Sequence, residues 1–314
     1  MIKAIRYIRC HIFFVLLCFF NNQVYAQKEN IASDFVEIQK DTLGKQYHFY
    51  ISKYAVSVKN YQDYLNFLGL ELSESPDYGW SDKTLPMVLV SYNDALSYIY
   101  WMTDVFQVQF RLPTEIEWML AADSNQKQLH ISKEIPICTD CASPNKNGIY
   151  GMNGNVWEWT STLKDKEFNI LKGGSYADDS DKNLKDNTFA ISPSLKLIDV
   201  GFRLVMDVNE MKKFEFAFKV EEILKKLFPE YTNIRVEPYG LYLNDGEILW
   251  KQKKPIVAID YKELKLKLCC VNYETKSNSN IQPKTVELYF DKKEIKLVEE
   301  LQKIIHTRDL TIFE

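Results

Sequence analysis

Two cysteines separated by two residues, Cys138 and Cys141, form the arrangement in this chain that could most directly do chemistry. This spacing suits a short disulfide loop, half of a tetrahedral metal site, or a redox dithiol. A metal site needs a second pair of ligands, and only His130 lies nearby in the sequence. We therefore favour a local disulfide. Cys269 and Cys270 are adjacent in an expected strand, where alternation directs their side chains to opposite faces.

The first 26 residues predict the compartment in which those cysteines reside. They carry three basic residues and no acidic one, and an apolar run over residues 12–20 is too short to span a bilayer. Val24-Tyr25-Ala26 supplies the pattern of a signal peptidase site. We expect a signal peptide over residues 1–26 and an exported protein that is periplasmic or secreted, with association with the outer membrane as an alternative. Disulfides form in such compartments.

Cleavage would change the charge balance and leave a chain without a membrane helix. It removes three of the 39 basic residues and none of the 43 acidic ones. The cleaved chain would have 36 basic and 43 acidic residues, which gives a formal charge of −7. This balance excludes a generally basic nucleic-acid binder. No second long apolar stretch follows, so no transmembrane helix is expected after cleavage. The remaining chain is long enough for about two domains.

The first of these domains is expected over residues 36–206, after an N-terminal linker over 27–35. Its expected elements, placed by apolar spacing and capping residues, are a strand over 47–54 and helices over 57–68, from Ser91 and from Thr114. Ser91 with Asp94 is expected to form a capping box. Periodicity fades after residue 123, and residues 124–203 are rich in glycine. We expect an irregular half held by buried aromatic side chains.

The second domain is expected over residues 214–314, after a polar linker over 207–213, of which residues 209–213 could also be the start of a helix. Its expected elements are a helix over 214–228, strands over 241–243, 248–250, 255–261, 264–273 and 285–290, and a last helix from Asp291. Asn244-Asp245-Gly246 between two apolar triplets predicts a hairpin. The order helix, antiparallel sheet, helix predicts a small α+β domain.

Five ordered segments of the first domain carry a family resemblance. They are Lys53-Tyr54-Ala55-Val56-Ser57, Val90-Ser91-Tyr92-Asn93-Asp94-Ala95, Arg111-Leu112-Pro113-Thr114-Glu115-Ile116-Glu117-Trp118, Gly151-Met152-Asn153-Gly154-Asn155-Val156-Trp157-Glu158-Trp159-Thr160, and Lys172-Gly173-Gly174-Ser175-Tyr176 with Gly201-Phe202-Arg203. In this order they resemble the formylglycine-generating enzyme, or sulfatase-modifying factor, family. The resemblance covers residues 36–206 and not 209–314. It implies a C-type-lectin-like, loop-rich α+β fold.

Most residues of these segments are expected to be architectural. Arg111 and Arg203 would bridge loop carbonyls or pair with Glu115 or Glu158 through a planar fork. The expected apolar anchors of the loop-rich core are Trp118, Trp157 and Trp159.

The resemblance also implies an oxidase in which two cysteines hold copper between the Gly-Gly-Ser segment and the final Gly-Phe-Arg. In this chain the interval from Tyr176 to Val200 contains no cysteine and no histidine. Cu(I) needs soft thiolate ligands. Cys138 and Cys141 precede the Gly-Asn-Val-Trp-Glu-Trp motif and do not match the family's positions. We therefore expect no catalytic residue and no copper cofactor.

Calcium is the second feature that the resemblance implies. The family's ligands match the carbonyls of Gly154 and Val156 and the carboxylate of Glu158, but Gly151 stands where a side-chain oxygen is needed. Calcium takes six or more oxygens. Unless Asn153, Asn155 or water substitutes for that oxygen, we expect a degraded site with weakened calcium affinity, empty rather than filled, and we expect no other cofactor.

An intact scaffold beside an emptied catalytic interval favours a pseudoenzyme that binds or scaffolds a protein, peptide or glycan in the cell envelope. One alternative is an enzyme of the same family with non-haem iron or cofactor-free chemistry. His48, His130 and His306 are too dispersed to nominate an iron triad. The other alternative is a component of a bacterial secretion or gliding machine, since some lipoproteins of such machines resemble this domain.

Overall fold

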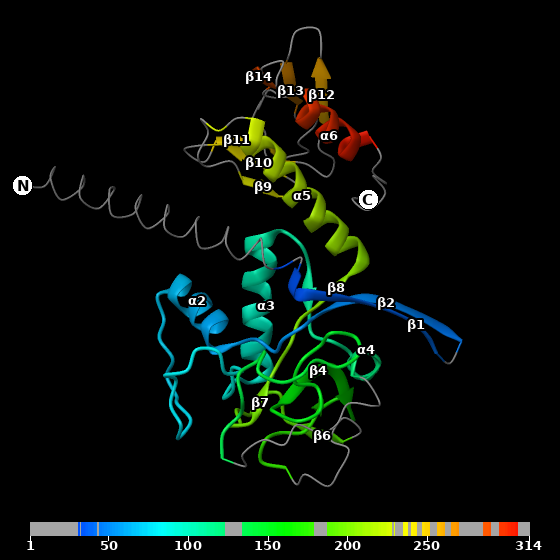
Figure 1. Cartoon of the computed structure of the whole chain (residues 1–314). Helices are drawn as coiled ribbons and strands as arrows, with labels where there is room; N and C mark the ends of the chain where they lie inside the picture. The colour runs from blue at the N-terminus through cyan, green and yellow to red at the C-terminus, as the bar shows by residue number, and fades with distance from the viewer. Residues whose placement is uncertain are drawn as a thin grey trace, which may run out of the picture. The chain divides into compact units, whose positions relative to one another are not determined.

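The computed structural model describes residues 31, 33–42, 44–122, 134–178, 187–227 and 229, and then 235–237, 240–243, 247–251, 256–260, 265–269, 285–289 and 295–306. The chain divides into two compact units (Figure 1). The first comprises Ser33–Val105 and Gln109–Val208, and the second comprises the described residues from Asn209 onward with Phe106–Val108. The predicted signal peptide lies outside the described residues.

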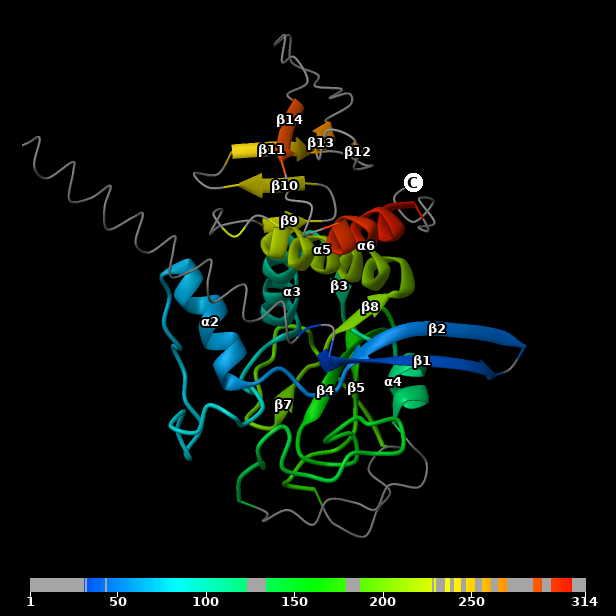
Figure 2. The same ribbon diagram turned by 45° about the horizontal axis from the view of Figure 1, so that its top comes forward.

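The first unit begins with a four-stranded sheet in the order β1-β2-β8-β3. Its strands are β1 (Phe35–Thr42), β2 (Lys45–Ser52), β3 (Phe110–Arg111) and β8 (Val205–Asp207). Figures 1 and 2 show β1 and β2 as a long hairpin that extends beyond the two shorter strands. Because β8 pairs with both β2 and β3, the sheet joins the two ends of the family-like segment.

A second four-stranded sheet has the order β6-β5-β4-β7. Its strands are β4 (Trp157–Lys164), β5 (Phe168–Lys172), β6 (Thr188–Ile191) and β7 (Val200–Gly201). The sequence predicted an irregular, loop-rich segment here; the described residues are indeed mostly loops, and the prediction missed only these short strands. Two of the strands span only four and two residues, and β4 slips register against β5. Such short, irregular pairing leaves no alternation for a sequence pattern to show.

The helices named among the described residues of this unit are α2 (Val58–Leu68), α3 (Tyr92–Phe106) and α4 (Glu115–Ala121). At the start of α3, Ser91 N–H donates to Asp94 Oδ2 at 2.9 Å and Asp94 N–H donates to Ser91 Oγ at 3.1 Å, so the predicted capping box forms. Thr114 and Glu117 make the same reciprocal pair at α4. Gly69 ends α2 at a φ of 69°, which glycine adopts without strain.

The core of the first unit is dominated by aromatic side chains. Trp118 and Trp159 are fully buried, as the sequence predicted. Trp157 is only partly buried, so that anchor prediction was wrong: its ring lies 6.1 Å from Phe189 at the surface of the second sheet. A separate cluster of rings packs between α2 and α3 and against the final Gly-Phe-Arg; its members are Tyr61, Tyr64, Tyr98, Trp101 and Phe202.

The second unit contains α5 (Val208–Leu227), β9 (Arg235–Glu237), β10 (Gly240–Leu243), β11 (Glu247–Lys251), β12 (Ile256–Asp260), β13 (Lys265–Cys269), β14 (Thr285–Tyr289) and α6 (Ile295–His306). Helix α5 begins at Val208, so residues 209–213 form the start of a helix, which is one of the two interpretations that their sequence allowed. One sheet was predicted, but the described strands form two, β11-β10-β9 and β12-β13-β14. The predicted hairpin pairs β10 with β11, while its turn lies outside the described residues.

No helix among the described residues has the length and apolar character needed to cross a membrane.

Candidate functional site

A buried ion pair links the two motifs that end the first unit. Arg203 Nε lies 2.6 Å from Glu158 Oε2, and Arg203 Nη2 lies 2.6 Å from Glu158 Oε1. Trp118 Nε1 donates to Glu158 Oε2 at 2.6 Å. The exposed fractions are 0% for Arg203 and 1% for Glu158. The planar fork predicted for Arg203 and Glu158 is therefore present, and both carboxylate oxygens accept hydrogen bonds.

Arg203 also ties together two other stretches of backbone, around residues 52–53 and at residue 150. Its Nη1 donates to the carbonyls of Ser52 at 3.0 Å and Lys53 at 3.3 Å. Its Nη2 donates to the carbonyl of Tyr150 at 2.9 Å. With the two bonds to Glu158, all five N–H donors of the guanidinium have an acceptor. Arg203 is thus a structural hub.

The second sheet explains how Glu158 and Arg203 meet. Strand β4 pairs in parallel with β7, so that Glu158 lies opposite Gly201, two residues before Arg203. A Cβ at position 201 would lie 2.6 Å from the Met87 carbonyl oxygen, which only glycine avoids.

Arg111 has a different partner from the one that its sequence position suggested. Its Nη1 and Nη2 each lie 2.7 Å from an oxygen of Glu117, not Glu115, and its Nη2 also lies 2.7 Å from Asp207 Oδ1. Burial alone would raise the pKa of Glu117, but hydrogen bonds from Arg111 and Thr114 hold it below its usual value. Sequence reasoning missed this role because Glu115 and Glu117 share the first turn of α4.

A buried lysine begins the Gly-Gly-Ser segment, and sequence reasoning did not single it out. Lys172 Nζ donates to Thr188 Oγ1 at 2.9 Å and lies 3.7 Å from Glu115 Oε1. The lysine therefore ties β5 to β6 and to the start of α4. The signal that could have found it is a charged residue directly after the apolar pair Ile170-Leu171 in a strand, 168–172.

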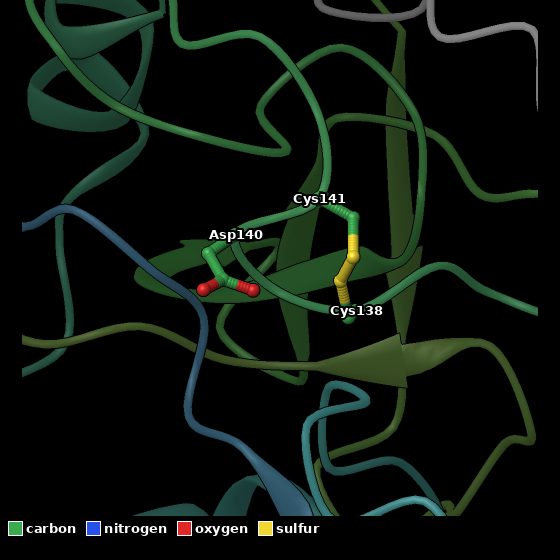
Figure 3. A group of neighbouring side chains, drawn as sticks. All are labelled: Cys138, Asp140 and Cys141. Carbon is green, nitrogen blue, oxygen red and sulfur yellow. A yellow bond between two sulfur atoms is a disulfide. The ribbon is translucent and has the colours of Figure 1, made fainter.

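Cys138 and Cys141 form a disulfide, with 5.2 Å between their Cα atoms. Figure 3 shows them on one loop together with Asp140, which lies between them in the sequence. Residue 130, the other ligand weighed for a metal at this pair, lies outside the described residues.

With this geometry established, comparison with known proteins assigns the family. The sequence matches the sulfatase-modifying factor enzyme 1-like domain over residues 39–136 and 132–208, which is more than half of the chain. The chain belongs to the sulfatase-modifying factor family. This confirms the resemblance and the predicted loop-rich, C-type-lectin-like α+β fold of the first domain.

Individual family members show partial similarity to the chain. It is 32% identical over 137 residues to the bovine (Bos taurus) inactive C-alpha-formylglycine-generating enzyme 2, covering 34% of this chain and 44% of the relative. It is 32% identical over 174 residues to the mouse (Mus musculus) protein of that name, covering 44% and 54%. The chain thus spans about half the length of these relatives. PvdO from Pseudomonas aeruginosa superimposes with a TM-score of 0.46 at 19% identity, covering 55% of this chain and 90% of PvdO.

The calcium ligands expected in this family do not fit an ion in the present geometry. Glu158 already accepts hydrogen bonds on both oxygens from Arg203 and Trp118. Asn155, which could have supplied a substitute oxygen, accepts from Ile137 N–H through Oδ1 at 3.0 Å. A cation at Gly154, Val156 and Glu158 would have to displace the guanidinium, and that carries a large energetic penalty inside a protein.

The interval that holds copper ligands in the family carries oxygen groups in this chain. Ser175 N–H donates to Asp178 Oδ2 at 2.7 Å, and Ala177 N–H donates to Ser175 Oγ at 3.2 Å. Burial raises the pKa of Asp199, and the charge of Asp178 raises it further. Hydroxyl and carboxylate oxygens are hard ligands, so this donor set does not fit Cu(I). Residues 179–186 of the interval lie outside the described residues.

Proposed function

We propose that this protein is a non-catalytic member of the sulfatase-modifying factor family that is exported and acts as a binding or scaffold module in the cell envelope. The observation that carries the proposal is the interval from Tyr176 to Val200, which has no thiol to bind copper or attack a substrate. The bovine and mouse relatives are also named as inactive enzymes. We further propose that the domain works without calcium at Gly154, Val156 and Glu158.

The retained scaffold supports binding as the remaining role. Selection for a fold without its chemistry would keep residues such as Arg203, which donates to three carbonyls in two backbone segments. The second sheet also presents an aromatic pair: Trp157 and Phe189 lie 6.1 Å apart, and Phe189 is 51% exposed. Exposed aromatic side chains are enriched where proteins bind partners. We propose this pair as part of the surface that binds an envelope protein, peptide or glycan.

Cell fractionation with chemical cross-linking tests the location and the surface together. Intact mass of the purified protein should show cleavage after Ala26, and cross-linked species should be found in the envelope fraction. Substituting Trp157 and Phe189 with alanine should reduce the cross-links, whereas Phe168→Ala, a change at another exposed ring of the sheet, should not. A retained leader, a cytoplasmic protein or undiminished cross-linking would contradict the proposal.

A further inference from the structure

The disulfide loop, residues 138–141, is attached to the first unit by backbone hydrogen bonds around the cysteines. Ile137 N–H donates to Asn155 Oδ1 at 3.0 Å, and the Ile137 carbonyl accepts from Asn155 Nδ2 at 3.2 Å. Thr139 N–H donates to the Thr84 carbonyl at 2.9 Å. None of these bonds involves sulfur. Reduction of the disulfide would therefore leave the loop held in place.

This loop carries three side chains of types that can bind a metal ion, and they lie close together (Figure 3). Cys138, Asp140 and Cys141 each offer one ligand atom, and these atoms all lie within 4.8 Å of one another. Asp140 and Cys141 are exposed, so an ion in the solvent can reach them. Two cysteines separated by two residues have the spacing found in tetrahedral zinc sites.

The charges around the loop favour a cation. Residues 137–141 include no basic side chain. Two thiolates formed beside Asp140 would concentrate negative charge on this loop, and a divalent cation would offset that charge.

We propose that reduction converts this loop into a binding site for a thiophilic divalent cation such as Zn²⁺, held by the Sγ atoms of Cys138 and Cys141 and one carboxylate oxygen of Asp140. A dithiol reductant supplies the two electrons and two protons that turn the disulfide into two thiols, and is itself oxidised to a disulfide. The two thiols release their protons as the metal binds, because thiolate is the ligand. Three protein ligands leave a fourth position for water or for a side chain of a bound partner.

The site would make the loop a redox-gated element. When it is oxidised, the sulfur–sulfur bond closes the loop; when it is reduced, the metal ion closes it. This role differs from the copper chemistry of the family, since these cysteines precede the Gly-Asn-Val-Trp-Glu-Trp motif, and it does not depend on the proposed envelope function.

A zinc titration of the full chain tests the site. The protein is reduced with dithiothreitol, desalted without oxygen and titrated with Zn²⁺ in competition with a chromogenic chelator. The reduced wild type should take up about one ion more per chain than the Cys138→Ser/Cys141→Ser variant. The matched control, Cys269→Ser/Cys270→Ser, should bind as much more Zn²⁺ than the Cys138→Ser/Cys141→Ser variant as the reduced wild type does. The oxidised wild type should show no such excess.

The third ligand is tested separately with Asp140→Asn. Because Asp140 is exposed, this change should preserve the fold, which near-ultraviolet circular dichroism can verify. Zinc affinity should fall by at least about tenfold, and Co²⁺ should show thiolate charge-transfer absorption in the wild type. Equal zinc uptake by the reduced wild type and the double serine variant would overturn the site. Unchanged affinity in Asp140→Asn would overturn the three-ligand arrangement.

Discussion

Replacing Arg203 with methionine should remove a large part of the stability of the first unit. Methionine keeps much of the side-chain volume, so the main loss is the charge and the five donors that serve Glu158 and three carbonyls. Leaving a buried carboxylate without its partner costs about 3–5 kcal/mol, and an unpaired buried carbonyl costs roughly 1 kcal/mol more. We expect a loss of about 4–6 kcal/mol, compared with a total stability of about 5–15 kcal/mol for a typical domain.

A double-mutant cycle with Glu158→Gln separates the ion pair from general damage. The double variant should be more stable than the sum of the single changes predicts, by at least about 2 kcal/mol, because each change removes the group that the other leaves unpaired. Urea unfolding followed by tryptophan fluorescence measures this, since Trp118 and Trp159 are fully buried. The control is Arg111→Met, whose partly exposed pair should contribute about 1 kcal/mol. An Arg203→Met loss no greater than that of the control would refute the reasoning.

Two further predictions concern packing and pH. Gly201→Ala should destabilise the folded protein by about 3 kcal/mol in thermal unfolding, because the added Cβ would meet the Met87 carbonyl oxygen. In the control Gly44→Ala the added Cβ has no atom within 4 Å, so stability should fall by only about 1 kcal/mol. Equal losses in the two variants would contradict this explanation. The lowered pKa of Glu117 stabilises the folded state fully at pH values above 4.5, the ordinary pKa of a glutamate. This contribution to the free energy of unfolding is lost as the pH falls through the lowered pKa of the folded state. The stability gap between wild type and Glu117→Gln should therefore narrow on acidification from neutral pH, and a gap that widens would show that the sign is wrong.

Local sequence rules predicted the helices of the first unit well. The pairing of Ser91 with Asp94 spans three residues and depends on capping geometry alone, so the sequence was sufficient. The partner of Arg203 was narrowed to two carboxylates and confirmed as Glu158, although the two residues lie 45 positions apart. Their meeting depends on the parallel pairing of β4 with β7, which no local pattern encodes.

The remaining differences have physical causes of the same kind. The mostly polar residues 209–213 suggested a linker or a helix start, because polar side chains suit both, and in the structure α5 begins at Val208. The oxygen types at Gly154, Val156 and Glu158 suggested calcium. A sequence shows which oxygens are present but not which donors already occupy them, and here Arg203 and Trp118 occupy those of Glu158.

Conversion of a sulfatase-type cysteine peptide tests the central claim most directly. The full chain is incubated with the peptide, Cu(I) and oxygen, and mass spectrometry follows the peptide thiol, beside a Cys138→Ser variant. The absence of thiols from Tyr176 to Val200 predicts that the peptide cysteine survives unchanged with both proteins. Copper-dependent conversion of that cysteine to formylglycine by the wild type would contradict the account. If the Cys138→Ser variant then failed to convert the peptide, Cys138 would be the residue responsible.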